Sequence, residues 1–173
     1  MKRLAMLFAL VATVFSATTV RAQGNDQLIA DWTRARAYTK AYLDAMPEDG
    51  YGLKPKPEMR SFAGQMLHIA DGNYFLIGTI TGKPGPLKDS AEKLITPTKE
   101  ATTKAVLDSY DYVINLLKTL TPAQMAAKGK VEGAEITGLQ SFDKAFEHQT
   151  HHRGQTTVYL RLKGVTPPGE MLF

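Results

Sequence analysis

Four histidines are the residues of this sequence best suited to chemistry. His68 stands alone, whereas His148, His151 and His152 lie within five residues of one another. Imidazole is the commonest side-chain metal ligand, and two histidines one helical turn apart can bind the same ion. A third histidine from another helix would complete a three-nitrogen site with a coordination position open to water or substrate. Because the chain contains no cysteine, we expect its chemistry to lie at these histidines.

The spacing of the three later histidines leaves two pairings open. On a helix, His148 and His152 differ by about 40° in direction, and His148 and His151 differ by about 60° in the opposite sense. The alternative is structural, since a lone histidine such as His68 is more often a hydrogen-bonded core or surface residue than a ligand. Joint placement on two core-facing helices of a chain with no further histidine favours a metal site.

Glycines surround the histidines in the sequence. Gly64 and Gly72 stand four residues before and after His68, and a glycine inside a helix costs about 0.5–1 kcal/mol relative to alanine. We therefore expect this helix face to stay open for a closely approaching helix or a bound group. Gly154 is likewise expected to allow close packing against another helix.

Periodicity and turn signals predict four long helices. Their approximate ranges are 26–45, 58–81, 99–120 and 139–163. Proline and glycine interrupt the chain between them, most strongly at residues 82–86. This pattern predicts an all-α fold, a four-helix bundle, and such bundles hold metal ions on facing helices in their core.

Two shorter segments are less regular. Thr121, followed by a proline and by Gln124, is a helix-start signal, and it predicts a short helix that ends near Lys128. Gly133 and Gly138 bracket a stretch that is either a loop or a brief extended piece.

The first 22 residues have the features of a signal peptide. Met1–Arg3 is basic, residues 4–14 form a short apolar run, and small residues precede Gln23. The apolar run is too short for a membrane-spanning helix, which needs about 20 residues; a buried first helix is the alternative. We expect residues 1–22 to be removed, leaving one domain over 23–173 that is periplasmic or secreted and has no membrane anchor.

Removal of this segment changes the charge of the protein. The whole chain has 21 basic and 17 acidic residues, and Lys2, Arg3 and Arg21 belong to the predicted signal peptide. The mature protein is therefore close to neutral, which argues against a nucleic-acid partner. Without cysteine it must also be held together by packing alone.

Two motifs resemble the signatures of the DinB/YfiT-like family of four-helix proteins. The first is Leu67–Asp71 around His68, and the second is His148-x-x-x-His152 followed by Arg-Gly-Gln. The close of the chain, with its Pro167–Pro168 pair, and the opening helix around Trp32 are also similar to the family pattern. The resemblance extends over residues 26–168.

The resemblance implies a divalent ion, typically zinc or nickel, held by three histidines on two helices. Carried over to this sequence, the ligands are His68, His148 and His152. The match to the second motif selects His152 over His151, which becomes a neighbour of the site.

Further polar residues stand one turn from these ligands. Asp71, Gln155 and His151 are candidates to hydrogen-bond the ligands, and ordinary polar residues of a helix are the alternative. Arg153 is expected to pair with an acidic neighbour such as Glu147 or Asp143 and so to hold the helix in place, rather than to bind substrate.

Three neutral imidazoles leave a bound ion its full double positive charge and an exchangeable position. Such an ion lowers the pKa of bound water toward 7 and can polarise a carbonyl or activate a thiol. The resemblance implies thiol-dependent transfer and isomerisation that use low-molecular-weight thiols such as bacillithiol and mycothiol, but these thiols are cytoplasmic. For an exported chain we predict a metal-dependent hydrolase or transferase acting on an unknown small molecule.

The alternative function is a non-catalytic metal-binding helical bundle. No glutamate adjoins a histidine in the His-Glu-x-x-His manner, and Glu147 directly precedes His148 rather than standing three residues before it. No catalytic residue is therefore assigned from the sequence. The apolar faces of the first and third predicted helices would allow a homodimer.

Overall fold

The computed structural model describes residues 25–173, and the predicted signal peptide, 1–22, lies outside the described residues. In chain order the elements are a first helix over 25–45, η1 (Glu48–Gly50), α2 (Phe62–Thr81), α3 (Ala91–Leu94), α4 (Lys99–Leu117), α5 (Pro122–Ala126), β1 (Lys128–Val131), β2 (Ala134–Thr137) and α6 (Gly138–Leu162).

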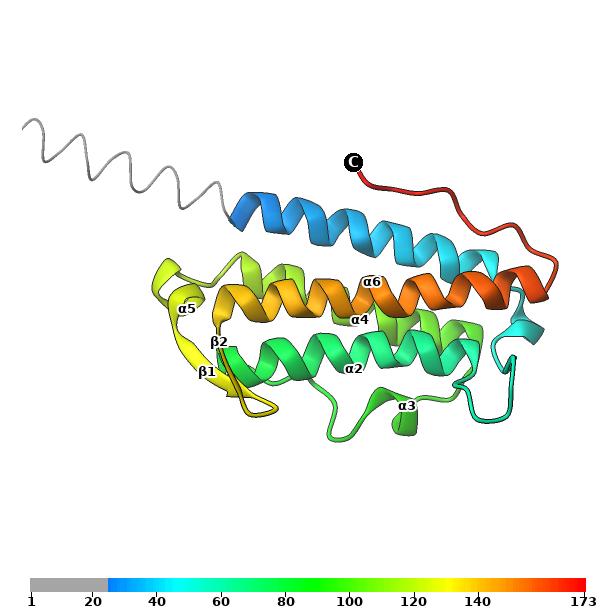
Figure 1. Ribbon diagram of the computed structural model, residues 1–173, viewed down its shortest axis with the longest axis horizontal. Coiled ribbons are helices and arrows are strands. Elements are labelled where there is room, and N and C mark those ends of the chain that lie inside the picture. The colour runs from blue at the N-terminus through cyan, green and yellow to red at the C-terminus, as the bar shows by residue number, and fades with distance from the viewer. Residues whose placement is uncertain (1–24) are drawn as a thin grey trace, which may run out of the picture.

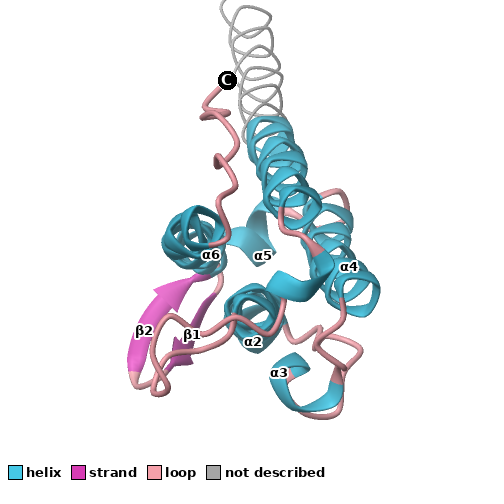
Figure 2. Cartoon of the chain, turned by 90° about the vertical axis from the view of Figure 1, so that its right-hand side faces the viewer, coloured by secondary structure: helices cyan, strands magenta, loops and turns pink. Residues whose placement is uncertain are grey.

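Within residues 25–173, four long helices lie side by side: the first helix, α2, α4 and α6 (Figures 1 and 2). α2 packs against both α4 and α6. The first helix lies against α4 and α6 through Trp32, whose ring is 5.8 Å from that of Tyr110 and 5.4 Å from that of Phe146. The prediction of an all-α four-helix bundle is confirmed.

Capping residues and glycine set the helix ends. The helix-start signal at Thr121 forms a full capping box, although α5 ends at Ala126, slightly earlier than predicted. A second capping box, formed by Thr137 and Gln140, starts α6 and was not predicted from the sequence. α2 ends at Gly82, whose φ of 66° places it in the left-handed region that glycine tolerates.

Two small elements extend beyond the bundle. The stretch between α5 and α6 contains an antiparallel hairpin of β1 and β2, whose turn has positive φ at Glu132 (50°) and Gly133 (86°). α3 lies in the connection where the sequence indicates only a helix break. Both α3 and β1 pack against α2, on different sides of it (Figure 2). They therefore border the helix that carries His68.

Large side chains fill the space between the helices. Trp32, Phe62, Tyr110, Phe142 and Tyr159 are all fully buried. Burial stabilises a large apolar side chain by about 1.5–3 kcal/mol, so this packing provides a rigid frame for the histidines.

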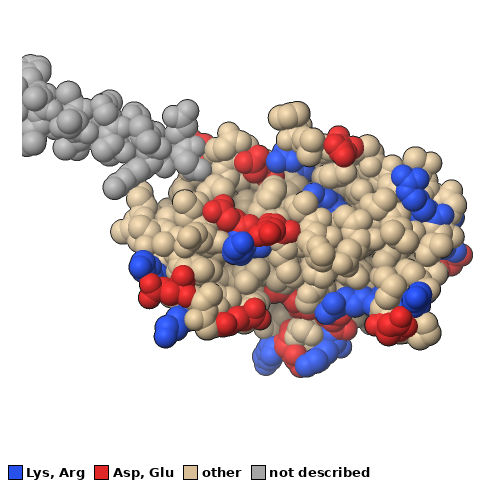
Figure 3. All heavy atoms as spheres, in the orientation of Figure 1, with Lys and Arg blue, Asp and Glu red and all other residues tan. Residues whose placement is uncertain are grey.

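The surface carries both signs of charge. Basic and acidic side chains are interspersed on the face shown in Figure 3, in line with a nearly neutral domain. Among the helices of residues 25–173, none combines the length and apolar character that crossing a membrane requires.

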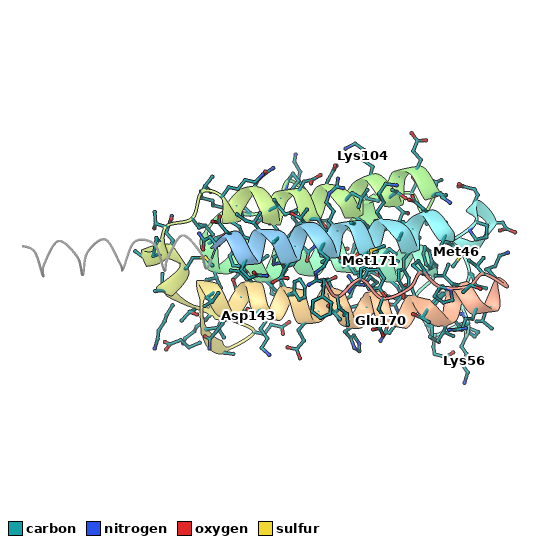
Figure 4. The ribbon with its side chains drawn as sticks, turned by 90° about the horizontal axis from the view of Figure 1, so that it is seen from above. Met46, Lys56, Lys104, Asp143, Glu170 and Met171 are labelled. Carbon is teal, nitrogen blue, oxygen red and sulfur yellow. The ribbon has the colours of Figure 1, made fainter. Side chains whose placement is uncertain are left out.

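The C-terminal segment turns back over the bundle after α6. It runs along the first helix and α6 and carries Glu170 and Met171 (Figure 4). The Arg34 guanidinium donates a hydrogen bond of 2.7 Å to the carbonyl oxygen of Met171, which ties this segment to the first helix.

Candidate metal centre

The packing of α2 on α6 brings three of the four histidines together. The ring centroid of His68, on α2, is 5.0 Å from that of His148 and 4.5 Å from that of His152, both on α6. The two α6 rings are 4.5 Å apart. One ligand nitrogen from each ring lies within 4.8 Å of the others. This is a suitable arrangement for one ion bound by three residues, and these are the residues selected from the sequence.

A glycine on α2 makes the close approach of His148 possible. A Cβ atom at Gly72 would collide with the imidazole ring of His148, so the ring lies against bare helix backbone. The expectation of an open face is met here. The expectation of close packing is wrong at Gly154, because this residue is exposed and an added methyl group would have no neighbour within 4 Å. At Gly64 the atoms nearest to such a methyl belong to Arg60 and Ser61, one turn earlier in the chain, and not to another helix.

Hydrogen bonds orient two of the rings. Nδ1 of His152 lies 2.8 Å from Oε1 of Gln65, and Nδ1 of His68 lies 2.8 Å from Oε1 of Glu92. Since both oxygens are acceptors, each Nδ1 carries the proton, and each Nε2 is left free to bind an ion. Nδ1 of His148 is buried with no hydrogen-bond partner among the described residues. A ring nitrogen left unpaired fits a group that is completed by a bound ion.

The surroundings of the two α6 histidines keep them neutral. Burial, reinforced by the neighbouring histidines and Arg60, lowers the pKa of His148 to about 4 and that of His152 to about 3. Both rings are therefore uncharged at pH 7, the form that binds a metal.

His151 and Gln155 form a pair of their own. The His151 side chain is exposed, and its Nε2 lies 2.8 Å from the amide nitrogen of Gln155. Its ring is 5.0 Å from that of His152. The expectation that Gln155 hydrogen-bonds a ligand is therefore wrong, because its amide contacts the bystander histidine. His151 lies next to the three-histidine cluster without joining it.

Asp71 also differs from its expected role. Its carboxylate accepts hydrogen bonds from the backbone N–H groups of Ala91 (2.5 Å) and Glu92 (3.4 Å) at the start of α3. Burial raises its pKa above the usual value, against the lowering effect of these bonds. Asp71 thus anchors α3, and it is Glu92 that bonds His68. Sequence reasoning missed Glu92 because it lies 24 residues from His68 in an irregular connection.

Arg153 is buried and has no acidic partner among the described residues. Its guanidinium donates to Oε1 of Gln149 (2.7 Å) and to Oγ1 of Thr39 (3.3 Å), and it lies over the Tyr38 ring at 4.3 Å. Of the two expected partners, Glu147 pairs with a lysine on the surface of α6 instead, and Asp143 forms no ion pair with Arg153. The expected ion pair is wrong, although Arg153 still ties α6 to its neighbour, here the first helix.

Two cavities border the histidine cluster. The smaller, of about 270 Å³, is lined by His68, Asp71, Gly72, Phe75, Leu76, Glu132 and His148. The larger, of about 750 Å³, is lined by Glu58, Met59, Arg60, Gln65, Glu92, His152, Gln155 and Val158. Either cavity could give water or substrate access to an exchangeable coordination position.

The fold and the cluster together define a helical bundle with three histidines between two of its helices, placed where they could hold a metal ion. The sequence profile of the DinB superfamily matches residues 31–156. The chain therefore belongs to the DinB superfamily, and the resemblance drawn from its motifs is confirmed.

Individual relatives agree with this assignment. YjoA of Bacillus subtilis (strain 168) is 23% identical over 147 residues, which cover 82% of this chain and 92% of YjoA. A DinB-like protein of Bacillus cereus ATCC 10987 has a similar structure, with a TM-score of 0.68 and 21% identity over 84% of this chain and 96% of that one.

YfiT of Bacillus subtilis shares the fold at lower identity. Its structure gives a TM-score of 0.61 and 17% identity, covering 81% of this chain and 87% of YfiT. YfiT is described as a probable metal-dependent hydrolase with an unusual four-helix bundle topology.

Proposed function

We propose that the protein binds one divalent metal ion, zinc or nickel, through His68, His148 and His152 and uses it for hydrolysis or group transfer. The juxtaposition of the three rings across two helices is the observation that carries this proposal. The low pKa values of the two α6 histidines and the unpaired nitrogen of His148 support it. The description of YfiT as a probable metal-dependent hydrolase supports the choice of reaction class.

A bound divalent ion would supply Lewis acidity and lower the pKa of a coordinated water toward 7. The protein's contribution is to hold three neutral donors in place and to leave two sides of the centre accessible. The apolar walls of the smaller cavity, Phe75 and Leu76, suit an apolar substituent of a substrate.

Glu132 is the carboxylate that we propose as a proton acceptor. It lines the smaller cavity together with His68 and His148 and forms no hydrogen bond within the described residues. Its positive φ in the hairpin turn is uncommon for a residue other than glycine, asparagine or aspartate. Asp71 lines the same cavity, but its carboxylate already accepts a hydrogen bond from the backbone of α3.

We propose in addition that the protein is exported after cleavage before Gln23. The basic start, the short apolar run and the small residues before Gln23 support this proposal. An exported enzyme would not meet cytoplasmic thiols, so ester or amide hydrolysis is favoured over thiol transfer.

The function is tested with a panel of esters, amides and thiol-transfer substrates. We expect turnover by the zinc- or nickel-loaded protein, no turnover after chelation, and none by His68→Ala. A protein that binds the ion but turns over no substrate in any of the three classes would support the alternative, a non-catalytic metal-binding bundle.

A further inference from the structure

Glu92 connects the histidine cluster to a part of the chain outside the bundle. It lies on α3, and its Oε1 accepts a hydrogen bond of 2.8 Å from Nδ1 of His68 on α2. The two side chains are each only about a quarter exposed, at 26% and 27%. A carboxylate–imidazole bond in such a partly shielded place is stronger than one in open solvent.

Glu92 is itself fixed from two directions. The Nε atom of Arg60 lies 3.1 and 3.0 Å from its two carboxylate oxygens. The Asp71 carboxylate accepts from the N–H groups of Ala91 and Glu92, which holds the backbone of α3 in place. Asp71 is one turn along α2 from His68, so the same helix carries both the histidine and the anchor of its partner.

We propose that Glu92 is a positioning residue of the metal centre. By accepting the Nδ1 proton of His68, it fixes the tautomer and the orientation of the ring and leaves Nε2 available for the ion. The role rests on the proposed function, because it requires that His68 binds a metal. Loss of such a carboxylate partner usually weakens metal binding by about 10–100-fold.

An alternative is that Glu92 binds an ion itself, together with His68 and Asp71. Ligand atoms of His68, Asp71 and Glu92 also lie within 4.8 Å of one another and could surround an ion. Two contacts oppose this: Asp71 is taken up by backbone N–H groups, and the Arg60 guanidinium beside Glu92 would repel a cation. His68 also cannot donate its Nδ1 proton to Glu92 and bind an ion with Nδ1 at the same time.

The test compares Glu92→Ala and Glu92→Gln with the wild type in two measurements. In the metal-free protein, ¹⁵N-edited NMR of the imidazole rings reports the tautomer of His68. We expect the Nδ1–H form in the wild type and a mixture of tautomers in Glu92→Ala. In zinc titrations we expect Glu92→Ala to bind about 10–100-fold more weakly. Glu92→Gln should lie between, because an amide oxygen still accepts a hydrogen bond but carries no charge.

Glu58→Ala is the matched control. Glu58 is exposed, lines the same larger cavity, and forms no hydrogen bond within the described residues. Its removal should leave both the zinc affinity and the His68 tautomer unchanged. This comparison separates a specific contact from a general loss of negative charge near the site.

The outcomes separate the two proposals. If the wild type binds one zinc ion and Glu92→Ala binds it as tightly with the same His68 tautomer, the positioning role is wrong and the metal site stands. Two ions per chain, with the second lost in Glu92→Ala, would also overturn the role, since Glu92 would then be a ligand. If the wild type binds no zinc, the proposed function fails first and the role fails with it.

Discussion

At the scale of single residues, the histidine cluster depends on the few groups that set where each ring lies. Gln65 and Glu92 hold the Nδ1 atoms of two rings, and Gly72 provides the space in which the third lies. None of these residues contacts the ion in the proposed site. They nevertheless determine whether three nitrogens can meet at one point.

Gly72→Ala should displace the His148 ring, because the new methyl group would collide with it. We expect a loss of stability of about 1–3 kcal/mol from overpacking and zinc affinity at least tenfold weaker. Gly154→Ala, also within a helix but with free space around it, should bind zinc normally and gain about 0.5–1 kcal/mol. Zinc titration and urea unfolding measure both effects. Normal zinc binding by Gly72→Ala would show that His148 is not held against α2.

The low pKa values of His148 and His152 predict how the stability of the metal-free protein depends on pH. In the unfolded chain both rings become protonated below about pH 6.5. In the folded protein His148 becomes protonated only near pH 4 and His152 only near pH 3. The unfolded state therefore binds more protons between these values, and stability falls as the pH decreases from 6.5 toward 4. Each ring contributes a slope of up to about 1.4 kcal/mol per pH unit.

Urea unfolding in the presence of a chelator, from pH 7.5 to 5, measures this slope. A His148→Asn/His152→Asn double variant should show a flatter profile, since it lacks both groups. Equal slopes in the two proteins would mean that these rings are not buried as neutral imidazoles.

At the scale of elements, the four long helices could be predicted from the sequence because each repeats its apolar residues at helical spacing. Helical spacing alone left the pairing of His148 with His151 or His152 open, and the resemblance to the family motif selected His152. α3 could not be predicted, because a four-residue helix is too short to show a period. Glu92 was missed with it, since its contact with His68 depends on the path of the connection. The roles of Gln155 and Arg153 depended on side-chain contacts that spacing does not determine.

The capping box at the start of α6 should contribute to stability but not to metal binding. Thr137→Ala removes a side chain that accepts from the backbone N–H of Gln140, and we expect a loss of about 0.5–2 kcal/mol. Zinc affinity should not change, because His148 lies about three turns further along. Thr79→Ala, at an exposed position inside α2, is the control and should leave stability unchanged or slightly raised, because alanine has the higher helix propensity. A weaker zinc site in Thr137→Ala would indicate that α6 shifts as a unit.

At the scale of the whole molecule, membership of the DinB superfamily accounts for the fold, and the proposed export limits the reactions that the protein could catalyse. The DinB superfamily profile spans most of the chain, but the residues that suggest export lie before its first matched residue, 31. When the full chain is produced in a Gram-negative host, we expect periplasmic protein whose mass corresponds to a start at Gln23. Recovery of uncleaved protein from the cytoplasm would contradict the proposed export, and thiol transfer would then no longer be disfavoured.

The central claim is that three histidines from two helices bind one ion, and elemental analysis after dialysis against zinc tests it most directly. The wild type and His151→Ala should each retain one ion per chain, because His151 only borders the cluster. His68→Ala and His152→Ala should each lose it. A wild type without a stoichiometric ion, or retention of the ion by both of these variants, would contradict the claim.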